Sequence, residues 1–447
     1  MIQLLVKIFL RNRIATASLI LLFAVGVISI SIGKKFLQQQ QAAIAETTLH
    51  QKEHIERLLK YENKEFGLLM YYLKFAYINP TENLAGLAIG QRDINSSIQV
   101  NTIRGLEGQK YDTDIRNPFQ LMMGNFDLSF VILYLFPLVI ISLCYNLYSE
   151  EKENGTWALL KTQSKNTARY LLIKMAVPYI FVLLVLALLF VIAAAWLQIP
   201  FNNSFVSFII SNSLYVSCWF AFALLVVTFF TSSAVNAISL LSIWLLLTLL
   251  LPAAINNYIT QKYTVPESLS TMLKQRDGYH KKWDIPKDST LKMFFKEYPQ
   301  YKTYQWKDEG FDWLWYYAMQ HMGDADARAD AELFMQKLQQ REEISRKFGY
   351  CLPTLYTLQY NTQLAKTNLQ NHLQFLDSSA ANHEKLRMKF YPKIFTAASV
   401  FKEDWTKQDP QYFTIKNTSS ILESLYTGLF VLMIAAAGFW RLKNLKK

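Results

Sequence analysis

MAVPYIFVLLVLALLFVIAAAWL, residues Met175 to Leu197, begins a run of 87 residues, Met175 to Gln261, that contains no Asp, Glu, Lys, Arg or His. A membrane-spanning helix needs about 20 apolar residues, and each charge at the bilayer centre costs about 2.5 to 3.5 kcal/mol. The run therefore has room for three spans. Polar residues interrupt it at Gln198–Ser204 and again at Thr231-Ser232-Ser233. The predicted spans are 175–197, 205–230 and 234–255.

Three further apolar stretches lie outside this run, at 14–33, 128–148 and 421–440. The sequence thus predicts a mainly α-helical, polytopic membrane protein with six transmembrane helices. An even number of spans puts both termini on one side of the bilayer, and basic residues mark the cytoplasmic side. Both termini are basic, with Lys7, Arg11 and Arg13 before the first span and four Lys or Arg in the tail 441–447. We therefore expect cytoplasmic termini, with 1–13 forming a helix in the plane of the inner interface.

With this topology, the two long polar segments, 34–127 and 262–420, are extracytoplasmic insertions. The first is expected to be α+β, with a long helix over 34–77 followed by short strands and turns. The second is expected to be mostly helical, with helices at 324–347 and 361–389. The chain carries 46 Lys and Arg against 34 Asp and Glu, a net charge of +12. We interpret that excess as a membrane-orientation signal and expect no nucleic-acid partner.

Cysteine usage and the N-terminal segment give two smaller expectations. Cys144 and Cys218 lie within predicted spans, so Cys351 is left as a lone cysteine outside them and cannot form an intrachain disulfide. The first apolar run is about 20 residues long, and the small-residue site Ala43-Ile44-Ala45 lies about ten residues beyond its end. We expect this run to be retained as a span and not cleaved as a signal peptide.

The sequence contains no recognisable catalytic motif for nucleotide chemistry or acyl transfer. GxxxxGK[ST], GxGxxG after a strand and GxSxG are all missing. We therefore expect no enzyme activity, catalytic residue or cofactor on this chain. His50-Gln51-Lys52-Glu53-His54 matches the HxxEH spacing of one class of zinc peptidase. A solvated helix face is the preferred interpretation of this motif, and a weak metal site or a peptidase are the alternatives.

The charged stretch SEEKENGTWALLKTQSKNTARYLLIK, Ser149 to Lys174, lies between the second and third predicted spans. Asn154-Gly155 is a pair that ends helices, and Thr156 is of a residue type that caps a new one. A short amphipathic helix is predicted after the pair. Its two faces are expected to carry Trp157, Leu159 and Leu160 on one side and Lys161 and Lys165 on the other. A helix of this kind can lie flat and dock on a partner.

The same stretch resembles the first cytoplasmic loop of ABC-2-type transporter permeases. The resemblance is carried by Glu150-Glu151-Lys152-Glu153-Asn154-Gly155-Thr156, then Leu159-Leu160, then Arg169-Tyr170-Leu171-Leu172-Ile173-Lys174 entering the next span. Upstream, Tyr111-Asp112-Thr113-Asp114, Asn117-Pro118, Phe126-Asp127-Leu128 and Tyr134-Leu135-Phe136-Pro137 look like a bacterial subset with large outer insertions. The resemblance is strongest from Tyr111 to Lys174 and thin across 262–420.

The resemblance implies a permease subunit, expected to be an exporter, in the bacterial inner membrane. A second permease chain and two separate ATPase subunits would complete the machine, with ATP and Mg on the ATPases. The loop would be the coupling helix that contacts an ATPase, with acidic and basic residues fixing the register and Trp157 as an anchor. The docking residues implied are Glu150, Glu151, Glu153, Gly155, Thr156, Trp157, Leu160 and Lys161.

Two other functions remain open from the residues alone. ATP-driven mechanotransmission would move the outer insertions against an envelope partner without translocation. A membrane-anchored scaffold or sensor would have no ATP coupling at all.

Uncharged polar residues in the fourth and fifth spans are also open to two interpretations. They either hydrogen-bond between helices, each bond contributing about 0.6 kcal/mol, or line a substrate path. The candidates for path lining are Asn212, Ser217, Asn236, Ser239 and Ser242.

Overall fold

The computed structural model describes residues 2–110, 125–163, 166–414 and 421–444. Among these residues, six helical stretches are long and apolar enough to cross a membrane, in agreement with the number predicted. They are α2 (Arg13–Tyr61), Leu128–Glu153, α10 (Thr167–Leu197), α11 (Asn203–Phe229), Ser233–Lys262 and α19 (Ile421–Asn444). The second stretch contains α6 (Leu128–Phe130), a short π-helix (Val131–Leu135), α7 (Phe136–Cys144) and α8 (Ser149–Glu153). The fifth stretch contains α12 (Ser233–Leu245), a short π-helix (Leu246–Leu250) and α13 (Leu251–Lys262).

Asparagine side chains begin three of these helices. Asn12 accepts hydrogen bonds from the backbone N–H groups of Ile14 and Ala15 at the start of α2. Asn166 does the same for α10, and Asn202, inside the predicted polar interruption, does so for α11. Each cap satisfies N–H groups that the first helical turn leaves without a partner. The first polar interruption, Gln198–Ser204, therefore supplies a helix cap as well as the turn between two spans.

Spans 1 to 5 share one apolar core. Its fully buried members include Ile30 of α2, Phe136 of α7, Leu189 of α10 and Trp219 of α11. The spans are buried to different extents. In the most apolar 18-residue segment of α11, 56% is buried, whereas the corresponding share is 11% in the fifth stretch and 12% in α19. The fifth stretch and α19 thus leave most of their apolar surface for lipid or another chain.

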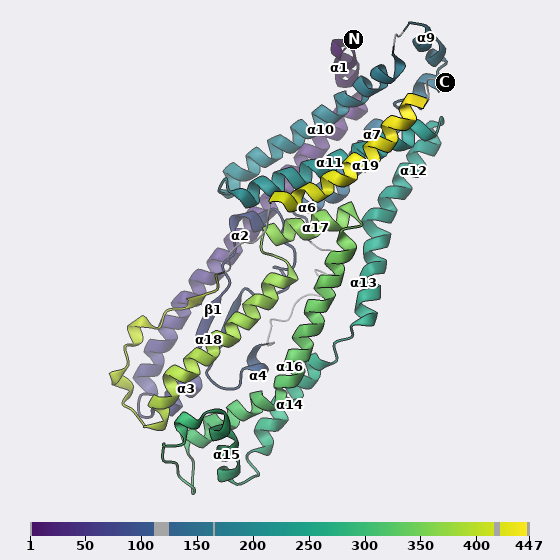
Figure 1. The fold of residues 1–447 in the computed structure, drawn as a ribbon. Helices are drawn as coiled ribbons and strands as arrows, with labels where there is room; N and C mark the ends of the chain where they lie inside the picture. Colours follow the sequence, from purple (N-terminus) through teal and green to yellow (C-terminus); the bar gives the residue numbers. More distant parts are fainter. Residues whose placement is uncertain (1, 111–124, 164–165, 415–420, 445–447) are drawn as a thin grey trace.

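The polar segments between spans 1 and 2 and between spans 5 and 6 fold together into one unit, here called the distal lobe (Figure 1). Its first part contains α3 (Phe66–Tyr72), β1 (Phe75–Ile78), β2 (Ile98–Asn101) and α4 (Glu107–Lys110). Its second part contains α14 (Glu267–Lys281), α15 (Lys287–Glu297), α16 (Trp313–Gly349), α17 (Pro353–Leu364), α18 (Leu369–Phe395) and β3 (Gln411–Tyr412). Within the lobe, α3 and β1 contact the outer part of α2.

A three-stranded sheet joins the two parts, in the order β2-β1-β3. β1 pairs antiparallel with β2, with Phe75 opposite Asn101, and parallel with β3, with Tyr77 opposite Gln411. The apolar core of the lobe also combines residues from both parts, such as Met70 with Tyr317 and Phe390. The two insertions therefore form a single folded unit.

Three details of the predicted secondary structure were wrong. The helix expected over 34–77 ends at Tyr61, and Phe75–Ile78 is a strand, because its four residues are buried between the neighbouring strands. The helix expected over 361–389 is two helices, α17 and α18, separated at Lys366, whose φ is 55°. The helix expected at 324–347 begins earlier, at Trp313, where Asp312 accepts a hydrogen bond from the N–H of Trp315.

Candidate functional site

The polar loop between the second and third spans lies at one end of the molecule. Figure 1 shows α9 (Thr156–Gln163) at the same end as both marked termini, and α14 and α15 at the opposite end. The loop and the two termini therefore face the same side, and the distal lobe faces the other.

Gly155 separates the two short helices of the loop. α8 ends at Glu153, and Gly155 has a φ of +73°, a conformation that residues with a side chain rarely adopt. The Asn154-Gly155 break predicted from sequence is therefore confirmed. Thr156 does not cap α9 in the expected way, because its hydroxyl points back and donates to the Glu151 side chain at 2.5 Å. This contact fastens the first residue of α9 to α8.

Glu151 ties the loop to the third span. Its carboxylate accepts hydrogen bonds from the Lys174 ammonium at 2.8 Å and from the Tyr170 hydroxyl at 3.1 Å. The Glu151 and Lys174 side chains are each 16% exposed, so solvent screens this ion pair less than a pair on the open surface. Glu150 adds a longer contact of 3.8 Å to Lys174. Two of the predicted docking residues thus make contacts within the chain.

Glu153 ties the loop to the fifth span. One carboxylate oxygen accepts from the backbone N–H of Ser233, the first residue of α12, and the other accepts from the Ser233 hydroxyl, both at 2.7 Å. The Ser149 hydroxyl lies 2.7 Å from the same Ser233 hydroxyl, and Asn236 donates to Ser149 at 3.4 Å. Glu153 therefore caps α12, a role that its position in an acidic run did not reveal.

Trp157 is half-buried against the end of the second span. Its ring packs edge-on against Tyr148 with ring centroids 4.8 Å apart, and the Lys152 ammonium lies over the Tyr148 ring, 4.9 Å from its centroid. A small apolar cluster continues from there to Leu171, Val227 and Leu442, which joins spans 2, 3, 4 and 6. Trp157 thus holds α9 to the protein itself.

The rest of α9 has no buried residue. Leu159 is 57% exposed, Lys161 is exposed and Leu160 is half-buried. The two-faced pattern predicted for this helix is only partly present, since Leu159 does not share the contact of Trp157 with Tyr148. Lys165, expected on the basic face, lies outside the described residues. An exposed apolar side chain next to a lysine, on a helix fixed at its base, is a surface that a partner protein could cover.

Two family models match the sequence. Residues 83–215 match a family described as ABC-2 membrane transporter related, and residues 269–414 match a domain of unknown function, DUF3526. The chain is an ABC-2 transporter-related membrane protein. A search of curated proteins gave no significant match.

In this ABC-2 transporter-related protein the first match covers the whole polar loop, from Ser149 to Lys174, with the spans on either side of it. The family assignment agrees with the resemblance carried by the loop, and membership implies ATPase partners in general. The second match, to DUF3526, covers most of the second polar segment, where the resemblance was thin. The upstream motif residues 111–124 lie outside the described residues.

Within the spans, the polar candidates of the transporter-related protein separate into two groups. Asn212 is buried and exchanges hydrogen bonds of 3.0 Å with Asn361 of α17, and Asn361 also donates to Ser129 at 2.9 Å. Ser217 contacts the Tyr179 hydroxyl at 3.0 Å. Asn236 is buried, Ser239 is half-buried and Ser242 is exposed. The contacts of Asn212 and Ser217, and that of Asn236 with Ser149 of the second stretch, fit interhelical hydrogen bonding. Path lining by the five residues stays a prediction.

The HxxEH motif lies on the part of α2 that belongs to the distal lobe. The His54 Nε2 atom lies 3.1 Å from the Tyr72 carbonyl oxygen, and His50 lies 3.4 Å from both Glu46 and Glu53. Among the residues that the structure describes, no group of three or more His, Cys, Asp or Glu side chains is arranged to hold a metal. These contacts fit the interpretation as a helix face.

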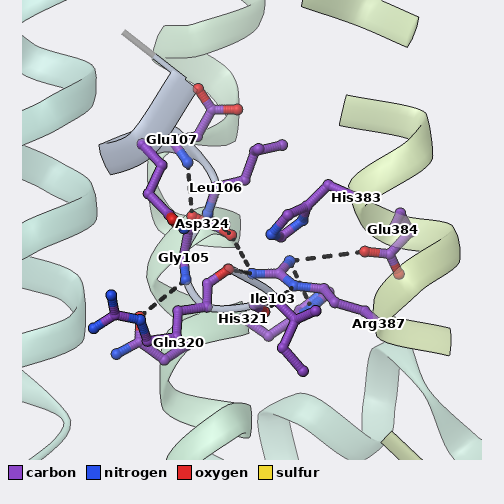
Figure 2. A network of polar contacts seen from close by, with 12 residues as sticks. Ile103, Gly105, Leu106, Glu107, Gln320, His321, Asp324, His383, Glu384 and Arg387 are labelled. Carbon is purple, nitrogen blue, oxygen red and sulfur yellow. Dashed lines mark hydrogen bonds and ion pairs between the residues drawn. The ribbon is translucent and has the colours of Figure 1, made fainter. Parts of the chain in front are cut away.

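Sequence reasoning missed a buried polar cluster in the distal lobe, centred on Arg387 of α18 (Figure 2). The Arg387 guanidinium donates to the carbonyl oxygens of Ile103 and Arg104 and to the Asp324 carboxylate, the last at 2.6 Å. Asp324 in turn accepts from the backbone N–H of Leu106 at 2.8 Å. Helices α16 and α18 thereby hold the 102–107 segment between them. These contacts join the DUF3526 region to the first insertion.

Proposed function

We propose that the chain is the membrane-spanning permease subunit of an ATP-binding-cassette exporter in the bacterial inner membrane. Two ATPase subunits would bind at the loop end, and a second permease chain, identical or homologous, would complete the complex in the bilayer. ATP and Mg would be bound by the ATPase subunits, and this chain would act as a transport subunit without catalytic residues. The observation that carries the proposal is α9, which has no buried residue and is fixed at its base to two spans.

The contacts of the loop explain how force on α9 would reach the membrane. Thr156 fastens α9 to Glu151, and Glu151 is bonded to Lys174 and Tyr170 of α10. Glu153 fastens the same unit to α12 through Ser233. A push on α9 would therefore move the third and fifth spans together. Changing a 1:99 preference between two states to 99:1 takes about 5.5 kcal/mol of differential binding, and nucleotide-dependent docking of the ATPases would supply it.

This arrangement divides the predicted docking residues into three roles. Glu150, Glu151 and Glu153 are positioning residues, because their carboxylates are used within the chain. Leu160 and Lys161, together with Leu159, form the surface that an ATPase would cover. Gly155, Thr156 and Trp157 set the angle of α9 to the spans. Contact with the ATPase is proposed for the exposed face of α9 alone.

The topology that goes with this function has cytoplasmic termini and an extracytoplasmic distal lobe. Cys351 offers a test, because it is exposed at the α16–α17 turn while Cys144 and Cys218 are buried. A membrane-impermeant maleimide added to intact cells should label the wild-type chain and leave Cys351→Ser unlabelled. Labelling of Cys351 only after the cells are permeabilised would reverse the proposed topology.

ATPase association is the central test of the proposal. The full-length chain would be affinity-purified from mild detergent extracts of its host, and co-purified ATPase would be measured by quantitative mass spectrometry. Leu159→Asp should reduce the recovered ATPase by at least tenfold, because a charge replaces the exposed apolar side chain of α9. Leu49→Asp is the matched control, since Leu49 is also 57% exposed and lies on the opposite side of the bilayer in the proposed topology.

Equal recovery of ATPase from both variants would exclude the α9 assignment. Recovery of no ATPase from the wild type would favour a membrane-anchored scaffold or sensor without ATP coupling.

A second candidate function is mechanotransmission to an envelope partner. The observation that favours it is α2, which passes from the first span into the distal lobe without a break. Phe401, 74% exposed on the lobe, is a suitable position for a photo-crosslinking residue in intact cells. A cross-linked envelope protein whose capture depends on ATP hydrolysis would support this function. Transport by the reconstituted complex without any such partner would support the exporter.

A further inference from the structure

The distal lobe contains a cleft of about 760 Å³ that the proposed permease function does not use. It lies between the edge strand β2 on one side and the helices α14, α16 and α18 on the other sides. Its volume is within the range of about 300 to 1,000 Å³ typical of pockets for small organic ligands. The cleft is therefore large enough to bind a ligand.

One wall of the cleft is aliphatic. It is built by Leu269 and Met272 of α14, Leu338 of α16, and Leu373 and Leu376 of α18. Leu373 and Leu376 are buried, but Leu269 is 63% exposed and Met272 is 40% exposed. Exposed apolar side chains from one helix that face buried ones from another form a surface that an apolar chain would cover favourably.

The other side of the cleft is cationic. Lys74, Arg104 and Lys110 line it, and no Asp or Glu is among the described residues that form its walls. The Arg104 guanidinium is held in place, because its Nε donates to the Thr102 hydroxyl at 3.1 Å and its face lies over the Tyr71 ring, 4.4 Å from the centroid. Lys110 has a partner, Glu107, at 3.9 Å. The cleft thus has a net positive lining.

Two of the cations, Lys74 and Arg104, lie at a different end of the cleft from Leu373 and Leu376. The pairing of Phe75 with Asn101 puts Lys74 next to Thr102, close to Arg104. On α18, His383 contacts the Thr102 carbonyl oxygen at 2.9 Å, and Leu376 and Leu373 lie two to three helical turns earlier. The cations Lys74 and Arg104 therefore lie at the end of the cleft where Arg387 clamps the 102–107 segment. The leucines lie at the end nearer the spans.

From this separation we propose that the cleft binds a single-chain anionic amphiphile, an acyl chain with one anionic head group. The head group would lie against Arg104 and Lys74, and the chain would cover Leu269, Met272 and the α18 leucines. A small inorganic anion would leave the apolar wall exposed, and a neutral chain would desolvate the cations without pairing them. An anionic amphiphile satisfies both surfaces, and Arg104, fixed by Thr102 and Tyr71, needs little reordering to receive it.

Binding can be measured on the full-length chain in nanodiscs of zwitterionic lipid, without the ATPase, so the result is independent of the proposed function. The probe is 11-(dansylamino)undecanoic acid, whose fluorescence rises in an apolar site, and empty nanodiscs give the baseline. Saturable binding is expected above that baseline, with displacement by unlabelled dodecanoate. The methyl ester of the probe, which lacks the charge, should bind at least tenfold more weakly.

Two variants test the two ends of the cleft separately. Lys74→Gln combined with Arg104→Gln should weaken binding of the acid by at least tenfold and leave binding of the ester unchanged. Leu269→Gln, a change at an exposed position, should weaken both. Lys292→Gln is the control, since Lys292 is 75% exposed on α15 and outside the cleft. Equal affinity of the acid for the wild type and both cleft variants, or absence of saturable binding, would overturn the proposal.

Discussion

Arg387 in the distal lobe and Glu151 in the polar loop each organise a hydrogen-bonded cluster, but the two clusters have different surroundings. The Arg387 side chain is 4% exposed and that of its partner Asp324 is 12% exposed, with the aromatic core of the lobe around them. Glu151 and Lys174 are 16% exposed, and α9, directly beyond them, has no buried residue. The lobe buries its cluster inside a core, whereas the loop uses its cluster as the base for an uncovered helix.

The difference supports placing the proposed ATPase contact at the loop end of the molecule. In the lobe, backbone carbonyls, Asp324 and Arg387 satisfy one another, so stability depends on them. In the loop, the carboxylates of Glu151 and Glu153 bond to neighbouring spans, and Leu159 and Lys161 remain exposed. We therefore expect substitutions in the lobe cluster to cost stability, and substitutions on α9 to cost association.

The largest effect is expected for Arg387→Met. Removing the guanidinium leaves the Asp324 carboxylate buried without its cation, and breaking a buried pair in this way costs about 3–5 kcal/mol. Thermal unfolding of the detergent-purified chain should show a clear loss of Tm. Arg328→Met is the control, because Arg328 is 54% exposed and its ion pair with Glu297 is on the surface. Similar Tm values for the two variants would show that the buried Arg387 cluster does not contribute more to stability than an exposed ion pair.

The second effect is a loss of lobe stability in acid. Burial, reinforced by the nearby Arg387 charge, lowers the pKa of His321 to about 2 and lowers the pKa of His383 well below its usual range. Glu297, 3.7 Å from His321, would favour the protonated form but does not outweigh burial. Because both pKa values lie below the unfolded value of about 6.5, the stabilisation is complete above that pH and is lost as the pH falls.

The expected slope below pH 6.5 is up to about 1.4 kcal/mol per pH unit for each histidine. Tm measured between pH 7.5 and pH 5 should show it, with His280→Gln as the control for a histidine outside the cluster. A variant with both His321→Gln and His383→Gln should lose part of the slope. A slope that is unchanged in this variant would assign the acid sensitivity to other groups.

A smaller loss of stability is expected when the ion pair between Glu151 and Lys174 in the polar loop is removed. Glu151→Gln keeps the shape of the side chain but removes the charge that pairs with Lys174, and hydrogen bonds to charged groups contribute about 1.5–3 kcal/mol. Tm should fall by less than in Arg387→Met, and ATPase activity coupled to the permease should fall as α9 loosens from α10. Glu46→Gln, at a side chain 71% exposed, should do neither.

The smallest effect on stability is expected for Leu159→Asp. An exposed substitution away from any buried contact changes stability by about 0.5 kcal/mol or less. The Tm of the isolated chain should therefore match that of the wild type while ATPase recovery falls. A large drop in Tm would show that α9 is part of the fold and not a free surface.

The sequence was sufficient for the spans and insufficient for the lobe. Charge exclusion over Met175–Gln261 made the spans visible, because a bilayer penalises each charge directly. The sheet was not visible, because β1 pairs with β3 across more than 300 residues, and the Phe75–Ile78 stretch followed a long helical pattern. Contacts over that distance depend on tertiary packing, which local propensity does not encode.

The candidate site was predicted only where it depends on local sequence, because its other contacts join residues that are far apart in the chain. The Asn154-Gly155 break is local and was predicted. The partners of Glu151 and Glu153 are Lys174 and Ser233, on two different spans, so an acidic run looked like an external docking surface. Arg387 was missed because a single arginine on a polar helix resembles a solvated side chain until the facing elements are known.

Helix α2 has a consequence for the amplitude of motion. Its 49 residues, Arg13 to Tyr61, form one rod roughly 73 Å long, of which about 42 Å lies beyond Gly33. At Gly33 the rod touches the backbone of Gly86 so closely that a Cβ would meet the Gly86 carbonyl oxygen at 1.9 Å. A tilt of about 10° around this point would carry the far end of α2 through about 7 Å. A small tilt of the first span inside the bilayer would thus displace the far end of the distal lobe by several ångströms.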